Sequence, residues 1–248
     1  MNLQEILEAV AAGDRSVSEA QREIEGYTRV EDFARLDTER ADRGGIPEVV
    51  LADGKSTDQL RAIVAEFLDE RGHVIVSQVD AETRSTLAAD APVTDWNDRA
   101  NMLVLRTESY EPPNSAGTVA VVSGGTADVP VAEEAVVTAR EMGCTVETYY
   151  DVGVAGIHRL LSEVAAFADA DSIVVAAGRE GALPTVVAGL VDVPVIGLPV
   201  SIGYGHGGDG EAALAGMLQS CTVLSTVNID AGFVAGAQAA QIARIRDA

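Results

Sequence analysis

The sequence predicts an α/β protein with two parts: a doubly wound parallel sheet in its second half and a smaller α/β domain before it. Short apolar strands alternate with helices along most of the chain, and glycine-rich loops follow several strands. Residues 172–176 and 193–198 are apolar throughout, as in parallel strands that are buried on both faces. Such sheets bind ligands beyond the carboxyl ends of their strands, so we expect a site there.

The N-terminal residues 1–35 are expected to form a helical segment. Apolar residues recur there at helical spacing, namely Leu3, Ile6, Leu7 and Val10. The capping-box sequence of residues 16–19 predicts the start of a second helix.

Residues 36–111 are expected to form the smaller α/β domain. Its predicted strands are residues 48–51, 74–76 and 102–105. A capping box at residues 56–59 predicts a helix that continues to about Arg71.

The stretch Pro-Pro-Asn-Ser-Ala-Gly at residues 112–117 stops any regular element and predicts a linker. The main domain is expected to span residues 117–248. Its predicted strands are residues 118–123, 145–150, 172–176, 193–198 and 223–227. Its predicted helices are residues 129–141, 157–168, 211–218 and 233–246.

The composition limits the partners and the location. A net charge of −22 disfavours nucleic acid and anionic membrane surfaces as partners. The sequence has no apolar run long enough for a membrane span and begins without the pattern of a signal peptide, so we expect a soluble, cytoplasmic protein. Lys55 is the one lysine, and the spread of acidic residues indicates either a salt-rich cytoplasm or ordinary acidic solubility.

The cysteines and histidines do not predict a zinc site. They are Cys144, Cys221, His73, His158 and His206, and none of them has the spacing of zinc ligands. Mg²⁺ stays open, because it needs only one or two carboxylates together with phosphate oxygens.

The first glycine loop of the main domain is a candidate phosphate site. Its candidate binding residues are Ser123, Gly124, Gly125, Thr126 and Asp128. Backbone N–H groups beside paired glycines can close on a phosphate, and the following helix start adds partial positive charge. The alternative is a plain turn in which Asp128 stabilises the helix N-terminus.

Two further loops carry charged residues. His158 and Arg159 lie at a helix start, where positive charge is unfavourable, so either an anionic ligand or a carboxylate elsewhere in the chain is expected to offset them. After the third strand of the main domain come Gly178, Arg179 and Glu180. Glu180 is a candidate general base, and a surface ion pair with Arg179 is the alternative.

The last loops hold a glycine-rich stretch and a cysteine. The five glycines of residues 199–210 predict a mobile loop that closes over a ligand. Cys221 follows a helix and precedes a strand, and it is either a nucleophile or, more commonly, an inert core residue. Asn228 and Asp230, beyond the last strand, are candidate substrate-binding residues.

These loops, in this order, resemble the aminoimidazole ribonucleotide (AIR) carboxylase domain of purine synthesis. The similarity covers residues 123–243 and includes Gly-Gly-Thr-Ala-Asp, Ala-Gly-Ile-His-Arg, Ala-Ala-Gly before Leu-Pro, and Pro-Val-Ile-Gly-Leu-Pro-Val. The purine enzymes have a catalytic histidine directly before that Leu-Pro, where this chain has Ala182. The resemblance implies a flavodoxin-like, three-layer αβα (PurE-like) fold and a homo-octamer with sites shared between subunits.

The whole chain is more similar to the LarB family, which begins synthesis of the nickel-pincer cofactor. The family's N-terminal signature lies in residues 36–55 and includes Asp37, Arg40, Arg43, Glu48 and Lys55. The purine enzymes lack this segment.

LarB proteins add CO₂ to the pyridinium ring of nicotinic acid adenine dinucleotide and hydrolyse its phosphoanhydride. The products are AMP and a pyridinium biscarboxylic acid mononucleotide. The resemblance implies that Cys221 adds covalently to the ring, that Glu180 helps to remove a proton, and that Mg²⁺ is required. The sequence departs from the family after Cys221, where Thr222-Val223 replaces the usual Pro-Gly turn.

Two other functions remain open at this stage. One is a purine-type carboxylase or mutase that acts on an imidazole ribonucleotide. The other is a regulatory protein that keeps the fold and binds nucleotides without turnover.

Overall fold

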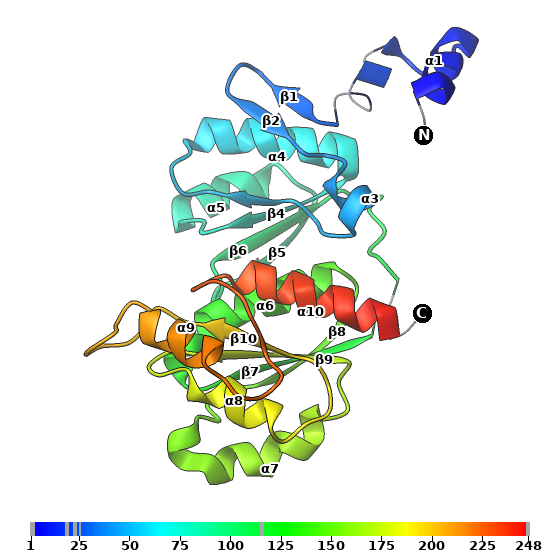
Figure 1. Cartoon of the computed structure of the whole chain (residues 1–248). Coiled ribbons are helices and arrows are strands. Elements are labelled where there is room, and N and C mark those ends of the chain that lie inside the picture. Colours follow the sequence, from blue (N-terminus) through cyan, green and yellow to red (C-terminus); the bar gives the residue numbers. More distant parts are fainter. Residues whose placement is uncertain (1–2, 18–19, 22–23, 25, 115–116, 247–248) are drawn as a thin grey trace. The chain divides into compact units, whose positions relative to one another are not determined.

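The computed structural model describes residues 3–17, 20–21, 24, 26–114 and 117–246 (Figure 1). The chain divides into two compact units. Unit 1 comprises Met1–Asp95 and Leu103–Tyr110, and unit 2 comprises Trp96–Met102 and Glu111–Ala248. Within the described residues, no helix combines the length and the apolar character that crossing a membrane requires.

The N-terminal segment is only partly helical. Helix α1 (Leu3–Ala12) is present, but β1 (Thr28–Val30) and β2 (Ala34–Leu36) form an antiparallel hairpin. The prediction of a helical segment to residue 35 is therefore wrong at its end, because three-residue strands are too short to show a clear alternation. The second predicted helix begins on residues that include 18 and 19, which lie outside the described residues.

Unit 1 is built around a four-stranded sheet with the order β3-β4-β6-β5, whose β5–β6 turn belongs to unit 2. The strands are β3 (Val49–Leu51), β4 (His73–Ser77), β5 (Val93–Asn97) and β6 (Met102–Arg106). The predicted capping box is confirmed, since Ser56 and Gln59 each accept the other's backbone N–H at the start of α4 (Thr57–Arg71). Strand β5 and the helices α3 (Arg40–Gly44) and α5 (Ala81–Ala89) were not predicted from the sequence.

Unit 2 contains a five-stranded, all-parallel sheet with the order β11-β10-β9-β7-β8. The strands are β7 (Thr118–Ser123), β8 (Thr145–Tyr149), β9 (Ser172–Ala177), β10 (Val195–Pro199) and β11 (Ser225–Thr226). Every residue of β9 and β10 is buried, as their apolar sequences predicted. The last strand is shorter than predicted, and Val223 is 95% exposed rather than part of it.

Helices cover both faces of this sheet (Figure 1). They are α6 (Val129–Glu141), α7 (Ile157–Phe167), α8 (Ala182–Ala188), α9 (Glu211–Leu218) and α10 (Gly232–Arg246). Leu160, Phe167, Leu183 and Met217 pack in one cluster with strand residues, which places α7, α8 and α9 on the same face. Helix α6 packs closely against α10, where a side chain on Gly236 would meet the carbonyl oxygen of Ala135. The predicted α/β fold class is confirmed.

The chain order of the strands reverses between β7 and β9. The chain runs from β7 outward to β8 on one side, and then from β9 to β10 and β11 on the other. The loops that leave β7 and β9 therefore diverge at a topological switch point, which is where doubly wound sheets bind their ligands.

A partly buried carboxyl group lies where α6 meets the start of α10. Glu134 accepts a hydrogen bond from the backbone N–H of Phe233, and the Asp230 carboxylate lies nearby. Burial, followed by repulsion from Asp230, raises the pKa of Glu134 to about 7. The folded chain therefore holds this proton more tightly than the unfolded chain does.

We expect the free energy of unfolding to decrease as the pH rises from about 4.5 to about 7, because the folded state must then ionise a partly buried carboxyl group. Glu134→Gln keeps an acceptor for the Phe233 N–H and removes the charge. It should stabilise the protein at pH 8 by on the order of 3 kcal/mol and have little effect near pH 4.5. Urea unfolding at the two pH values tests this, with exposed Glu163→Gln as the control. An equal effect of Glu134→Gln at both pH values would contradict it.

Candidate active site

Four loops, which follow β7, β8, β9 and β10, make direct backbone contacts in two pairs around the switch point. A Cβ on Gly153 would lie 2.5 Å from the carbonyl oxygen of Gly124, and a Cβ on Gly178 would lie 2.5 Å from that of Ile202. Any side chain at these two glycines would force the loops apart, since real Cβ atoms do not approach other atoms so closely. These two glycines thus allow each loop to touch its neighbour.

Asp128 joins the loops that follow β7 and β9. Its Oδ2 accepts the N–H of Gly125 at 2.8 Å, and its Oδ1 accepts the N–H of Gly178 at 3.2 Å. Asp128 is buried, and this burial raises the pKa of its carboxyl group. Because both of its oxygens accept protein N–H groups, Asp128 holds two loops in register at the mouth of the site.

A hollow of about 620 Å³ lies over these loops. This volume is within the range typical of small-molecule sites. Seven of the predicted site residues line it: Gly124, Gly125, Asp128, Arg159, Gly178, Arg179 and Glu180. Ala182, which replaces the histidine of the purine enzymes, lines it as well.

A smaller hollow of about 280 Å³ adjoins the larger one along the loop of residues 202–212. Arg179, Glu180 and Tyr204 line both hollows, together with Ile202 and Gly203. The structure thus offers two neighbouring compartments that share a wall.

Six predicted residues line neither hollow, namely Ser123, Thr126, His158, Asn228, Asp230 and Cys221. Three of them accept hydrogen bonds from backbone N–H groups. The Ser123 hydroxyl accepts the N–H of Asp151 at 3.3 Å, and Asp230 accepts the N–H of Ser201 at 2.9 Å. Asn228 accepts the N–H of Ile229 at 2.9 Å. Ser123, Asn228 and Asp230 therefore stabilise the loop backbone.

Arg159 is paired within the chain. Its Nη1 lies 2.8 Å from Oδ2 of Asp151 and donates to the Asp151 carbonyl oxygen at 2.6 Å. The positive charge at the start of α7 is therefore offset by a carboxylate of the protein, which is one of the two alternatives expected from the sequence. Asp151 also lines the larger hollow, although it was not among the predicted site residues.

Arg179 is held against Tyr204. Its guanidinium carbon lies 4.4 Å from the centre of the Tyr204 ring, and its Nη1 donates to the Tyr204 carbonyl oxygen at 3.5 Å. The Arg179 backbone has a positive φ of 55°, which is uncommon outside glycine. Glu180, the next residue, is exposed at the shared wall of the two hollows.

The two cysteines differ in their exposure to solvent. Cys144 is buried, and this burial raises the pKa of its thiol, which makes it unreactive. Cys221 is exposed, so the alternative of an inert core residue is wrong for it. The hydroxyls of Ser220 and Thr222 lie 2.8 Å apart and close a tight turn around Cys221, where the family usually has Pro-Gly.

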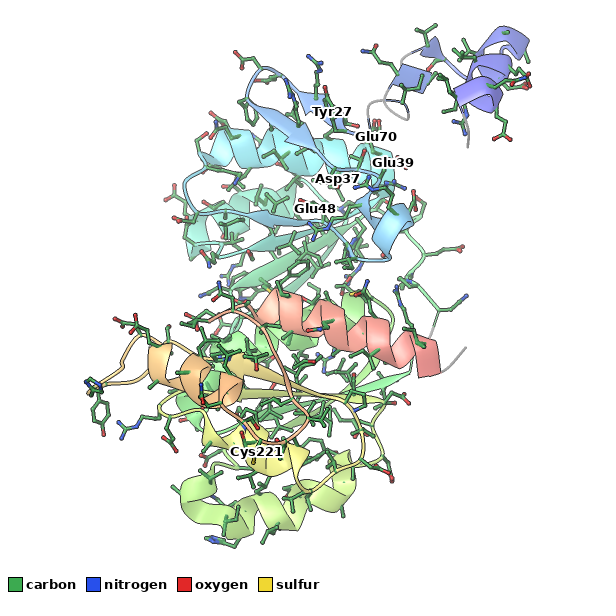
Figure 2. The ribbon with its side chains drawn as sticks, in the orientation of Figure 1. Tyr27, Asp37, Glu39, Glu48, Glu70 and Cys221 are labelled. Carbon is green, nitrogen blue, oxygen red and sulfur yellow. The ribbon has the colours of Figure 1, made fainter. Side chains whose placement is uncertain are left out.

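Cys221 and Glu180 are not together in one chain. Cys221 precedes β11 and therefore lies on the amino side of the sheet, near the end of α8, whereas the glycine loops follow the carboxyl ends of β7 and β9 (Figure 2). The side chain of Thr222 would be 4.0 Å from a Cβ on Gly189, the residue that caps α8. A reaction that needs both groups must therefore combine two chains or move this turn.

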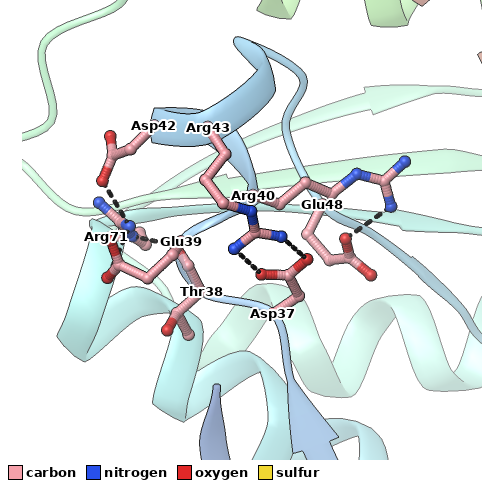
Figure 3. Close-up of polar contacts among 8 residues, drawn as sticks. All are labelled: Asp37, Thr38, Glu39, Arg40, Asp42, Arg43, Glu48 and Arg71. Carbon is pink, nitrogen blue, oxygen red and sulfur yellow. Dashed lines mark hydrogen bonds and ion pairs between the residues drawn. The ribbon is translucent and has the colours of Figure 1, made fainter. Parts of the chain in front are cut away.

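The N-terminal signature forms a network of ion pairs (Figure 3). Arg43 binds Asp37 through two hydrogen bonds of 2.9 and 2.6 Å, and Arg40 lies 2.8 Å from Glu48. Lys55 donates to the Leu51 carbonyl oxygen at 2.7 Å. The charges of the signature are therefore used within unit 1.

Arg71, at the end of α4, extends this network. It lies 3.0 Å from Glu39 and 2.7 Å from Asp42, and its Nε donates to the Thr38 carbonyl oxygen. Single exposed ion pairs add little stability, but these pairs share residues around the short helix α3. We interpret the signature as the element that holds α3 against the end of α4. Arg71 was not among the predicted residues, because it lies outside the signature segment.

The described residues contain no group of three or more His, Cys, Asp or Glu side chains that could hold a metal ion. The carboxylates at the larger hollow are Asp128, Asp151 and Glu180. Backbone N–H groups occupy Asp128, and Arg159 occupies one oxygen of Asp151. Glu180 and the other Asp151 oxygen are left as the ligands that a phosphate-bound Mg²⁺ could add.

Two family models match the chain in succession. The LarB/PurE-like N-terminal domain matches residues 27–108, and AIR carboxylase matches residues 118–248. The uncharacterized protein MJ0165 of Methanocaldococcus jannaschii is 38% identical over 254 residues, which covers 98% of each chain. The N5-carboxyaminoimidazole ribonucleotide mutase of the same organism is 34% identical over 134 residues, covering 52% of this chain and 80% of the mutase. The chain therefore belongs to the LarB family, with a PurE-like C-terminal domain.

Proposed function

We propose that the protein is a pyridinium-3,5-biscarboxylic acid mononucleotide synthase. It carboxylates the pyridinium ring of nicotinic acid adenine dinucleotide with CO₂ and hydrolyses the phosphoanhydride to release AMP. The single observation that carries this proposal is the exposed Cys221 in a chain that has Ala182, not histidine, at its larger hollow. The first supplies a nucleophile, and the second removes the residue that purine carboxylation uses.

The chemistry follows from an electron-poor ring. The Cys221 thiolate adds to a ring carbon, and the electron pair of the broken π bond makes the ring an enamine-type nucleophile. That nucleophile attacks CO₂ and forms the new carbon–carbon bond. Glu180 takes the proton from the carboxylated carbon, the thiolate leaves, and the ring regains its aromaticity.

The larger hollow suits an anionic substrate. Arg159 and Arg179 lie on its wall, and Glu180 is exposed at its edge. Mg²⁺, which the family resemblance implies, would be held by the pyrophosphate oxygens with Asp151 or Glu180, and it would reduce the negative charge of the anhydride.

The separation of Cys221 from Glu180 supports a shared site. We place Cys221 of one subunit on the substrate that lies against Glu180 of a neighbour, within the homo-octamer that the resemblance implies. The exposed Leu218 and Val223 beside Cys221 would be covered in such an assembly.

The test is an assay with purified protein, nicotinic acid adenine dinucleotide, bicarbonate and Mg²⁺. We expect release of AMP together with a doubly carboxylated pyridine mononucleotide, resolved by chromatography. If intact, folded protein releases no such product, the proposal is wrong.

The second candidate is a purine-type mutase, favoured by the 34% identity to the N5-carboxyaminoimidazole ribonucleotide mutase. Ala182 argues against it, because a methyl group cannot donate a proton to an imidazole. Growth of a purine-requiring host that lacks its own mutase, rescued by this chain, would decide in its favour.

A further inference from the structure

Tyr204 is the most exposed aromatic side chain in the described part of unit 2. The protein has only 4% aromatic residues, yet 82% of Tyr204 is accessible to solvent. It lies on the loop before α9, which extends away from the sheet (Figure 1). An exposed aromatic ring beside a hollow is a common feature of sites that bind flat ligands.

The chain holds this ring in place from one side. Arg179 stacks on it and also donates to its carbonyl oxygen, as described above. The backbone of Arg179 is left-handed. Gly178, the residue before it, contacts Ile202, and Gly203 lies close to Arg179 itself. An arginine that backs an aromatic ring in this way leaves the opposite face of the ring for another planar group.

Tyr204 lines both hollows, and the walls of the two hollows differ. The larger hollow has the glycine loop and also Arg159, whose cation suits phosphates, and both hollows include Glu180, which the reacting ring must reach. The smaller hollow has neither the glycine loop nor Arg159. Its wall includes glycines of the loop of residues 203–210 and His206, whose imidazole can both donate and accept hydrogen bonds.

We propose that Tyr204 is the stacking platform for the adenine base of a dinucleotide, with the smaller hollow as the adenine compartment. This inference rests on the proposed function, because a dinucleotide substrate has a second base that the reacting end of the site does not use. Tyr204 thereby selects a dinucleotide over a mononucleotide.

The test is calorimetric titration of the full-length chain with AMP and, separately, with ribose 5-phosphate, which lacks the base. Tyr204→Ala should weaken AMP binding by about 5- to 100-fold and change ribose 5-phosphate binding by less than about 2-fold. Tyr204→Phe keeps the stacking ring and should bind AMP within about 3-fold of the unchanged protein.

Tyr27→Ala is the matched control. Tyr27 also has an arginine against its ring, at 5.4 Å from Arg35, but it lies in unit 1 and lines neither hollow. AMP affinity should not change in this variant.

Three results would overturn the adenine site: unchanged protein that binds no AMP, equal AMP affinity in Tyr204→Ala, or an equal loss for both ligands. The titration needs no turnover, so it separates the two proposals. AMP affinity that depends on Tyr204 in a protein without synthase activity would refute the proposed function alone. Synthase activity with AMP affinity independent of Tyr204 would refute the adenine site alone.

Discussion

Replacing Cys221 with alanine should lower the synthase rate by about 1,000-fold or more, because no other described residue at the site supplies a thiolate to the pyridinium ring. Cys221 is exposed, so its removal should leave the melting temperature unchanged. Cys221→Ser should be nearly as inactive, since a hydroxyl is a much weaker nucleophile. Product formation is measured by chromatography of AMP and the carboxylated nucleotide.

Cys144→Ala is the matched control, because this buried cysteine lies outside both hollows and should not affect the rate. Substantial activity in Cys221→Ala, with the protein folded, would refute covalent catalysis by this residue.

Mixed assemblies test whether the site is shared. Cys221→Ala and Glu180→Gln chains are each expected to be inactive alone. When the two are co-expressed and mix at random, roughly a quarter of the sites should combine an intact cysteine and an intact glutamate from different subunits. If both groups act from the same chain, no site has both, and the mixture should stay inactive.

Gly216→Ala should disrupt the site by displacing the backbone of Glu180. Gly216 lies in α9, where a Cβ would be 2.2 Å from the carbonyl oxygen of Glu180. Alanine gains about 1 kcal/mol in helix propensity. The clash costs more than this, because the obstructing atom belongs to backbone and overpacking costs about 1–3 kcal/mol or more. We expect a net loss of stability of about 2 kcal/mol and at least a 10-fold loss of synthase rate, since Glu180 must move.

Gly189→Ala is the control for this change. A Cβ there would make only ordinary contacts, at 3.5 Å or more, and its φ is −85°. Urea unfolding and the synthase assay should show little effect. Gly216→Ala with unchanged stability would mean that α9 can shift away from the Glu180 loop without cost.

Regular elements were predictable where local signals agreed. Helices α6 and α9 have the predicted bounds, and α4 begins at its predicted capping box. Helix α8 was missed because it is short, contains Pro184 in its first turn, and follows a left-handed glycine in place of a polar cap. Strand β5 was missed because its first three residues are exposed and show no apolar alternation.

The site was predictable only in part, for a similar reason. The rule that ligands bind at the carboxyl ends of parallel strands identified the glycine loops and Glu180. Partners that are distant in sequence were not predictable, as with Asp128 and Gly178 or Arg179 and Tyr204. The place of Cys221 depends on where α9 ends relative to β11, which spacing alone does not determine.

The central claim is that this chain adds CO₂ to a pyridinium ring, and an isotope label tests it most directly. Purified protein is given nicotinic acid adenine dinucleotide, Mg²⁺ and ¹³C-bicarbonate, and the pyridine nucleotide product is analysed by mass spectrometry. We expect one labelled carboxyl carbon in each product molecule and one AMP for each labelled product. Release of AMP without incorporation of the label would show a simple pyrophosphatase and would contradict the account.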